Sequence, residues 1–314
     1  MPLTVTAEFD AHDVRDRLRE WVRAGRLEPE AEAGVHLLVE DRLAVPPDER
    51  APVRQPGVAM RAGPPEHVTR VLWESATRGP ADPPAAYAEL APGTARATVH
   101  LSRAAAADFE RALRTFVPVV VALLLRRVGW HHVHAATTID PSGRGWLFAG
   151  NSGSGKSTTA ALLATRGWQV GTDDFAFLVP GAGETIDVLG RYDPIALREG
   201  GHALLRAPGG LALPDRGKTG YTPQELGGRW TPRVTPRLLA FTRLGSTTTS
   251  VAPIEPRDVL AELMRWSLTG VVEPDAADAY LGVLSRLGRQ ARSFRLTLGR
   301  DIFDDPELLT RLVP

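Results

Sequence analysis

The chain has 314 residues, enough for one large or two modest domains with an ample core. Lysine plus arginine and aspartate plus glutamate both number 37, so the formal net charge is zero and does not indicate a nucleic-acid or acidic membrane partner. The chain has no cysteine, which excludes disulfides, thiolate metal sites and cysteine nucleophiles. Because no signal peptide is visible and the longest apolar run, 117–125, is too short to span a bilayer, we expect a soluble cytoplasmic protein without a membrane partner.

Residues 1–100 are expected to form an N-terminal accessory α+β region. Residues 46–66 are rich in proline, glycine and charge, which predicts a loop. A helix is expected to begin at Asp10 or His12, with Val14 and Leu18 on its buried face. Alternating apolar residues predict strands over 3–9, 35–39, 68–73 and 95–101. No catalytic pattern occurs in this region, so we expect it to extend the core or to recognise a partner.

The second domain is expected to span 101–314 and to begin with a helix. Ser102 is a good N-cap, and the helix should run to about Thr115. Pro118 is expected to break or kink it, because proline lacks the backbone N–H that continues a helix. Residues 119–127 then predict a second helix, almost entirely apolar and therefore buried against a sheet.

Residues 130–139 predict a strand that contains three histidines. His132 and His134 point to one side of this strand and His131 to the other. No carboxylate or cysteine lies at a metal-ligand spacing, which favours a core or active-site role over a metal site. A turn at 140–143 should lead into a short buried strand, 145–149.

Residues 150–157 match the phosphate-binding loop pattern G-x-x-x-x-G-K-[ST] in full, between the strand 145–149 and a helix, 158–166, that ends at Gly167. We call 150–157 the phosphate loop. Its glycines let backbone N–H groups turn inward around phosphate oxygens, and the helix N-terminus adds partial positive charge. Lys156 would reach the β- and γ-phosphates of ATP, and the Ser157 hydroxyl would bind Mg²⁺. The alternative is a glycine-rich turn. The expected nucleotide-binding residues are Gly150, Asn151, Ser152, Gly153, Ser154, Gly155, Lys156, Ser157 and Thr158.

Asp173 and Asp174 follow a predicted strand at 168–171. In doubly wound sheets, ligands bind at the carboxyl ends of the strands, so the Asp pair and the phosphate loop should share one edge. One carboxylate can hold Mg²⁺ while the other takes a proton from an attacking hydroxyl. The alternative is a pair that caps a turn.

The remaining residues predict a long loop followed by regular elements. Residues 205–236 predict a loop that is either a lid or acceptor-binding segment, with Arg216 or Lys218 approaching the γ-phosphate, or a solvated surface loop. After it we expect a strand at 238–244, helices from Pro256 to Trp266 and over 276–287, a strand at 293–298, and a terminal helix opened by Pro306.

The phosphate loop, Asp173-Asp174 and the upstream His134 together resemble the catalytic domain of HPr kinase/phosphorylase. More specifically, the chain resembles the HPr-kinase-related proteins of biosynthetic gene clusters, including the kinases of lasso-peptide pathways. The resemblance covers about residues 130–200. It implies an α/β fold with the P-loop kinase core that phosphoenolpyruvate carboxykinases share. It also implies that Lys156 binds phosphates, that Ser157 and Asp174 bind the metal, that Asp173 is the general base, and that His134 lies near the transferred phosphate.

One family signature is absent. The E-[IVL]-R-G-x-G stretch that should follow the Asp pair is replaced by residues 194–200, similar to the P-[IV]-[AS]-L-[KR] segment of the related proteins. There, Arg198 or Glu199 would face the phosphates. We therefore expect neither HPr as the acceptor nor phosphorylase activity.

The sequence thus predicts an ATP- and Mg²⁺-dependent phosphotransferase that acts on a hydroxyl, most simply a Ser or Thr of a peptide or protein. The alternatives are a kinase of a small molecule such as an amino acid or sugar, and a nucleotide-dependent regulatory module without an acceptor. No guanine-reading N-K-x-D motif and no transporter signature supports the last alternative. The sequence permits a homo-oligomer.

Overall fold

The computed structural model describes residues 3–8, 12–26, 32–46, 48, 53–55, 58–61, 68–73, 84–205, 209–213, 217–245, 247–267, 274–305 and 307–312. The chain divides into two compact units, each described by itself below. The first unit comprises residues 1–131 and 268–281, and the second comprises 132–267 and 282–314. The first unit therefore extends past residue 100, where we expected the accessory region to end.

In the first unit, the described strands form one seven-stranded sheet of order β1-β2-β7-β6-β5-β4-β3. These strands are β1 (Thr4–Ala7), β2 (Gly34–Glu40), β3 (Val53–Gln55), β4 (Val58–Arg61), β5 (Thr69–Trp73), β6 (Ala86–Leu90) and β7 (Arg96–Ser102). β1, β2 and β7 are parallel, and the others pair antiparallel. The four strands predicted in this region are confirmed, and β6 was not predicted.

The loop predicted over 46–66 is wrong in part, because β3 and β4 lie within it as an antiparallel pair. β4 also pairs with β5, and its residues Val58, Ala59 and Met60 are buried. Burial of these apolar side chains outweighs the local turn signals of the surrounding prolines and glycines.

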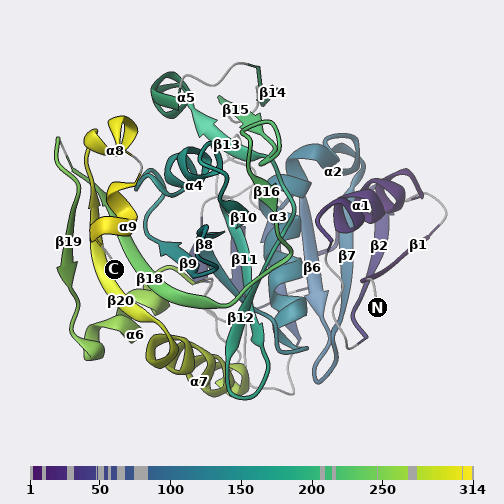
Figure 1. Cartoon of the computed structure of the whole chain (residues 1–314). Coiled ribbons are helices and arrows are strands. Elements are labelled where there is room, and N and C mark those ends of the chain that lie inside the picture. Colours follow the sequence, from purple (N-terminus) through teal and green to yellow (C-terminus); the bar gives the residue numbers. More distant parts are fainter. Residues whose placement is uncertain are drawn as a thin grey trace. The chain divides into compact units, whose positions relative to one another are not determined.

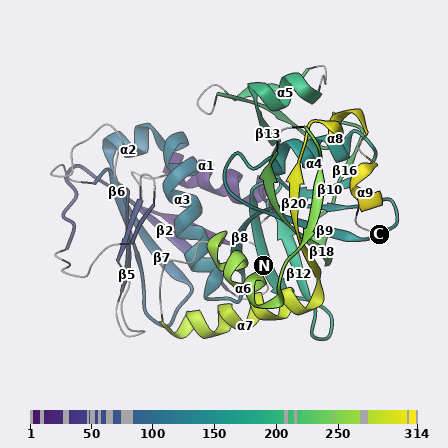
Figure 2. The same ribbon diagram turned by 90° about the vertical axis from the view of Figure 1, so that its left-hand side faces the viewer.

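Three helices accompany this sheet: α1 (His12–Ala24), α2 (Arg103–Ala107) and α3 (Phe109–Arg126). Figure 2 shows α1 and α3 on one face of the sheet. α1 buries Val14 and Leu18 as predicted, while Asp10 lies outside the described residues. The predicted cap of α2 is confirmed, because the Ser102 hydroxyl accepts a hydrogen bond of 3.1 Å from the Ala105 N–H.

A break or a kink was expected at Pro118, and the break is wrong. α3 runs through Pro118, and the chain interrupts its helix at Asp108 instead. Val117 and all residues from Val119 to Arg126 are buried, and α3 packs on β5 and β7 as expected. Burial of this apolar run outweighs the one backbone hydrogen bond that proline cannot make.

The second unit is built on a mixed sheet, which confirms the α/β class. Ten described strands take part, in the order β17-β12-β11-β8-β9-β18-β20-β19, with β10 pairing with β8 and β16. They are β8 (His131–Ile139), β9 (Gly145–Ala149), β10 (Gln169–Thr172), β11 (Phe175–Pro180), β12 (Ile186–Gly190), β16 (Arg229–Trp230), β17 (Arg233–Val234), β18 (Pro236–Leu244), β19 (Ser250–Pro253) and β20 (Arg292–Leu298).

The directions of β9 and β10 bring the phosphate loop and the Asp173–Asp174 pair together, although the sheet as a whole is mixed. β9 and β10 are both antiparallel to β8, so they run in the same direction. β9 ends at the phosphate loop and β10 ends at Asp173. Their carboxyl ends therefore lie at one edge, as predicted.

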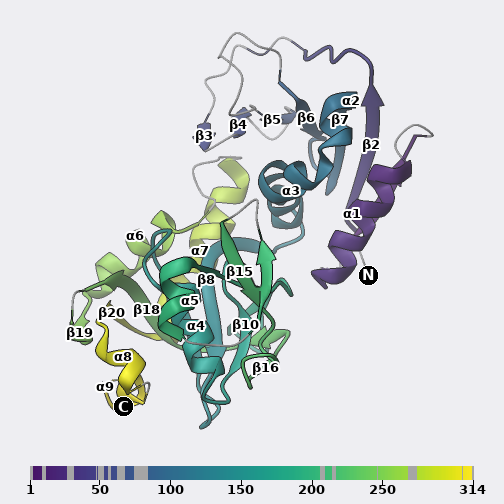
Figure 3. The same cartoon turned by 90° about the horizontal axis from the view of Figure 1, so that it is seen from above.

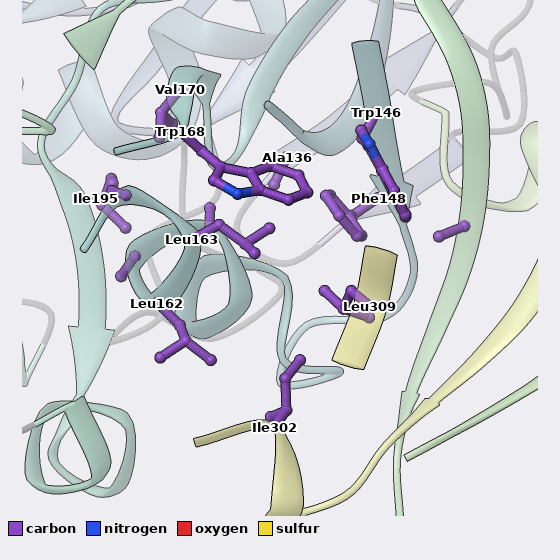
Figure 4. Close-up of a cluster of buried hydrophobic side chains, with 14 of the residues drawn as sticks. Ala136, Trp146, Phe148, Leu162, Leu163, Trp168, Val170, Ile195, Ile302 and Leu309 are labelled. Atoms are coloured by element: carbon purple, nitrogen blue, oxygen red, sulfur yellow. The ribbon is translucent and has the colours of Figure 1, made fainter. Parts of the chain in front are cut away.

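The helix after the phosphate loop, α4 (Lys156–Ala164), packs its apolar side into the core of the second unit. Figure 4 shows this core around the indoles of Trp146 and Trp168. The rings of Trp146 and Phe148 stack with centroids 5.7 Å apart. These buried contacts fix the position of β9 and α4, and therefore of the loop between them.

The loop predicted over 205–236 is also wrong in part. Its described residues include β14 (Leu211–Leu213) and β15 (Lys218–Tyr221), which form a three-stranded antiparallel sheet with β13 (Ile195–Arg198). We call this the small sheet. The short helix α5 (Glu199–Leu205) follows β13, and Figures 1 and 3 show it beside α4. Ile195, Leu197 and Tyr221 are buried in the core, and this packing organises residues whose local sequence indicates loop.

The C-terminal part follows the predicted order, with additions. Pro256 begins its helix as predicted, whereas Pro306 lies outside the described residues. β19 and α8 were not predicted. Among the described residues, no helix is long and apolar enough to cross a membrane. The remaining helices are α6 (Pro256–Arg265), α7 (Pro274–Gln290), α8 (Asp301–Asp304) and α9 (Leu308–Leu312).

Candidate functional site

The phosphate loop and the Asp pair line one cavity of about 530 Å³ in the second unit. The small sheet, α5, the ends of β18 and β20, and α8 form its other walls. Three predicted binding residues do not line it: Gly150, Asn151 and Ser154. The predicted site residues that line the cavity are His134, Ser152, Gly153, Gly155, Lys156, Ser157, Thr158, Asp173 and Asp174.

The phosphate loop has the backbone that its glycines allow. Gly153 and Gly155 have φ angles of +82° and +94°, which L side chains rarely adopt. The Ser154 hydroxyl lies 2.8 Å from the Thr242 hydroxyl, which ties the loop to β18. The side chain of Lys156 lies along the loop and donates to the carbonyls of Gly150 at 2.8 Å and Asn151 at 3.0 Å.

Gly155→Ala is expected to unfold at a lower temperature and to lose nucleotide binding. A Cβ at this position would lie 2.8 Å from the Leu298 Cδ1 atom, and the positive φ adds roughly 1–2 kcal/mol of strain. Thermal melting and ATP titration check this result. Gly183→Ala is the control, since Gly183 has φ +65° in a turn with no atom within 4 Å of the added Cβ. Equal ATP binding by wild type and Gly155→Ala would contradict the expectation.

Lys156 is a buried cation at the base of the cavity. Burial lowers the pKa of its ammonium from 10.5 to about 8, although the charges of Asp174 and Asp173 oppose the change. Its carbonyl partners are neutral, so a negatively charged phosphate would be a stronger partner than the present ones. Lys156 is therefore suited to bind phosphate.

Asp173 is a buried carboxylate, with 5% of its surface exposed. Its Oδ2 atom accepts a hydrogen bond of 3.1 Å from the Ala196 N–H, and the Ser157 hydroxyl also bonds to it. Burial and the neighbouring charge of Asp174 raise its pKa from 3.8 to about 6, although these hydrogen bonds oppose the rise. A carboxylate with this pKa can accept a proton near neutral pH.

Asp174 behaves differently from Asp173. His134 Nδ1 lies 2.5 Å from its Oδ1 atom, and 57% of the Asp174 side chain is exposed. Burial raises the pKa of Asp174, but the hydrogen bond and charge of His134 outweigh it, so this pKa lies below 3.8. The structure thus joins the two adjacent carboxylates to different partners and separates their pKa values, the pattern that marks an acid–base assignment.

The other two histidines of β8 do not line the cavity. His132 packs against the rings of Phe175 and Phe177, and burial lowers its pKa to about 3. His131 stacks on Tyr280. Within the described residues, no group of three or more histidines and carboxylates lies close enough to hold a metal ion by itself.

The side-chain oxygen atoms of Ser157, Asp173 and Asp174 nonetheless suit a magnesium ion that binds together with a nucleotide. Mg²⁺ in nucleotide sites keeps several waters and is held by one or two protein oxygens together with phosphates. Ser157, Asp173 and Asp174 all line the cavity and offer a hydroxyl and two carboxylates. This donor set suits a hard cation that arrives with a nucleotide.

Arg198, Lys218 and Arg300 all line the cavity, although the sequence indicated Arg198 and Lys218 only as alternatives and Arg300 was missed. Neither Glu199 nor any described residue of the predicted loop 205–236 other than Lys218 lines it. Arg216 lies outside the described residues. One sequence signal could have identified Lys218: the chain has 35 arginines but only two lysines, Lys156 and Lys218. The structure places both lysines in one cavity.

The cavity also has an apolar wall beside the phosphate loop. Leu244 and Leu298 are cross-strand partners at the ends of β18 and β20, and Ile302 and Phe303 of α8 lie next along the lining. Leu244 is 62% exposed, which is unusual for a large apolar side chain. A ligand with one charged and one flat apolar end would fit this combination.

No protein-family model matches the chain. No curated protein matches its sequence either.

Proposed function

We propose that this chain is an ATP- and Mg²⁺-dependent phosphotransferase with a P-loop kinase core of the HPr-kinase-related type. The observation that carries the proposal is the buried Asp173 carboxyl, whose pKa is raised to about 6, in the cavity that also contains Lys156 and Ser157. The acceptor is a hydroxyl, most simply of a Ser or Thr in a peptide or protein. The cytoplasm, where ATP is available, is the expected location.

Each residue has one task in this proposal. The loop N–H groups and Lys156 bind the phosphates and stabilise the charge of the transferred group. Asp173 accepts the proton of the attacking hydroxyl. His134 fixes the orientation and the charge of Asp174 through their hydrogen bond. Ser157 and Asp174 would hold Mg²⁺, which neutralises charge on the phosphate oxygens when bound.

Transfer of label from γ-labelled ATP into host-cell extract tests this function. The labelled products are separated into macromolecules and small molecules, and Asp173→Asn is run in parallel. Label in a peptide or protein that depends on Asp173 supports the proposal. Label in a metabolite makes the chain a small-molecule kinase. ATP binding without Asp173-dependent label in either fraction contradicts phosphotransfer and favours a regulatory module.

A bell-shaped dependence of kcat/KM on pH is expected, with limbs near pH 6 and pH 8. The raised pKa of Asp173 means that the base becomes protonated, and activity falls, as pH drops through about 6. The lowered pKa of Lys156 means that its charge is lost as pH rises through about 8. Steady-state rates between pH 5 and 9 at constant ionic strength measure both limbs. A value of kcat/KM that stays constant between pH 5 and pH 7 would contradict the assignment of Asp173 as the base.

A further inference from the structure

The small sheet has two different faces. One face packs into the core through Ile195, Leu197 and Tyr221. Because side chains alternate along a strand, the residues between these positions belong to the opposite face. Cross-strand register groups them into two rows, Ala196–Gly220–Leu211 and Arg198–Lys218–Leu213. Ala196, Arg198 and Lys218 line the cavity, so this second face begins at the candidate site.

The first row starts at the proposed base. The Ala196 N–H donates to Asp173 Oδ2, which joins the small sheet directly to the carboxylate. Beyond Ala196 the row continues with Gly220, which has no side chain. A Cβ on Gly220 would lie 3.1 Å from both the Leu213 Cδ1 atom and the Pro194 Cβ atom, so these two side chains cover the glycine. A segment of chain that follows this row from Asp173 would therefore contact Leu213 and Pro194 rather than the backbone of Gly220.

The second row provides positive charge without a matching anion on the sheet. Arg198 and Lys218 face each other across β13 and β15, and within the described residues the only carboxylates that line the cavity are Asp173 and Asp174. The charge of Lys218 acts on both carboxylates and on Lys156, so Lys218 lies toward the reacting phosphate. Arg198, its cross-strand partner, has an exposed side chain. A guanidinium in this position suits a carboxylate held by two parallel hydrogen bonds.

The face is longer than a small hydroxy compound needs. It crosses three strands, a width of roughly 10 Å at about 4.8 Å between neighbouring strands. Its far end is apolar: Leu211 is 64% exposed, and Leu213 lies beside it on β14. A face that begins beside a base and carries two cations, an exposed leucine and a partly exposed leucine matches an extended peptide rather than an amino acid or sugar.

We propose that the acceptor is an acidic segment of a polypeptide that lies across the small sheet. Its Ser or Thr hydroxyl lies at Asp173, an adjacent Asp or Glu pairs with Arg198, and an apolar side chain contacts Leu211 and Leu213. The hydroxyl oxygen forms a bond to the γ-phosphorus of ATP, the bond from that phosphorus to the β,γ-bridging oxygen breaks, the proton goes to Asp173, and ADP leaves. This inference rests on the proposed phosphotransferase function and specifies its acceptor.

A degenerate Ser/Thr peptide library with γ-labelled ATP and Mg²⁺ tests this acceptor. Labelled peptides from the wild-type reaction should be enriched in Asp or Glu next to the phosphorylated residue. For a peptide chosen from that pool, Arg198→Gln should raise KM by roughly 10- to 100-fold. For the same peptide with Asn in place of the acidic residue, KM should differ by less than twofold between the wild type and Arg198→Gln. The KM for ATP should not change.

Arg229→Gln is the matched control, because Arg229 is exposed on β16 and does not line the cavity. Absence of acidic enrichment, enrichment that persists in Arg198→Gln, or no labelled peptide would each overturn the acidic acceptor. If metabolites in host extract are then labelled in an Asp173-dependent way, the phosphotransferase proposal survives. If the chain neither binds ATP nor transfers label, both proposals fall. A raised KM for ATP in Arg198→Gln would assign Arg198 to the donor and overturn its acceptor role.

Discussion

Asp173→Asn is expected to lower kcat by about 10²- to 10⁴-fold, the usual contribution of a general base, while ATP still binds. Asparagine keeps the shape of the side chain and can still accept the hydrogen bond from the Ala196 N–H. It cannot take a proton at neutral pH. Single-turnover transfer and ATP titration measured on the same samples separate the loss of chemistry from the loss of binding. A rate within threefold of the wild type would rule out Asp173 as the base.

The same substitution is expected to stabilise the protein at neutral pH. The folded pKa of Asp173, about 6, lies above its ordinary value of 3.8, so the folded state favours the protonated carboxyl. Ionisation therefore costs stability as pH rises from 3.8 through 6, by an amount on the order of 1–3 kcal/mol, and asparagine removes this cost.

The melting temperature of Asp173→Asn should exceed that of the wild type at pH 7.5 and match it near pH 4. Asp278→Asn is the control, because Asp278 is an exposed carboxylate on α7 that does not line the cavity. A lower melting temperature for Asp173→Asn at pH 7.5 would show that the ionised carboxylate stabilises the fold, contrary to the raised pKa.

Lys156→Ala is expected to lower kcat by roughly 10²- to 10³-fold and to weaken ATP binding, because it removes a buried positive charge from the place where phosphate charge develops. Lys156→Arg is the companion variant. It keeps the charge, but its planar guanidinium needs more space than the ammonium, so only partial recovery is expected. Full activity of Lys156→Ala would exclude this lysine from phosphate binding.

The scarcity of lysine allows a direct measurement of the same site. Lys156 and Lys218 are the only lysines of the chain, and the lowered pKa of Lys156 leaves a larger fraction of its amine uncharged near pH 8 than in an ordinary lysine. Acylation followed by intact-mass analysis should show slower modification of Lys156 when ATP and Mg²⁺ are present. An unchanged rate of modification would mean that the nucleotide does not cover this residue.

The sequence was most informative where a local pattern has a local physical cause. The phosphate loop needs glycines at defined positions, and Gly153 and Gly155 have the positive φ angles that glycine adopts more readily than other residues. The strands before and after the loop, and the helix between them, follow from short apolar runs and a terminal glycine. Asp173 and Asp174 could be placed near the loop because neighbouring strand ends meet at one edge of a sheet.

Prediction failed where distant residues decide the structure. Residues 46–66 and 205–236 contain many turn-forming residues, yet β4 and β15 form because Met60 and Tyr221 are buried and pair with residues outside these stretches, Val71 and Ile195. α3 continues through Pro118 for the same reason, since an apolar run finds a sheet to pack against.

The sequence by itself determined the phosphate loop, its lysine and the adjacent carboxylates, because those features depend on residue type and short spacing. The family resemblance implied that Asp173 is the base, but only the tertiary structure provides a physical difference between the two carboxylates. Asp173 is buried against β13 and Asp174 is joined to His134, and this difference separates their pKa values. The structure also brought Arg198 and Lys218 to the cavity. Strand pairing between residues 20 positions apart sets that arrangement, and no local pattern encodes such a pairing.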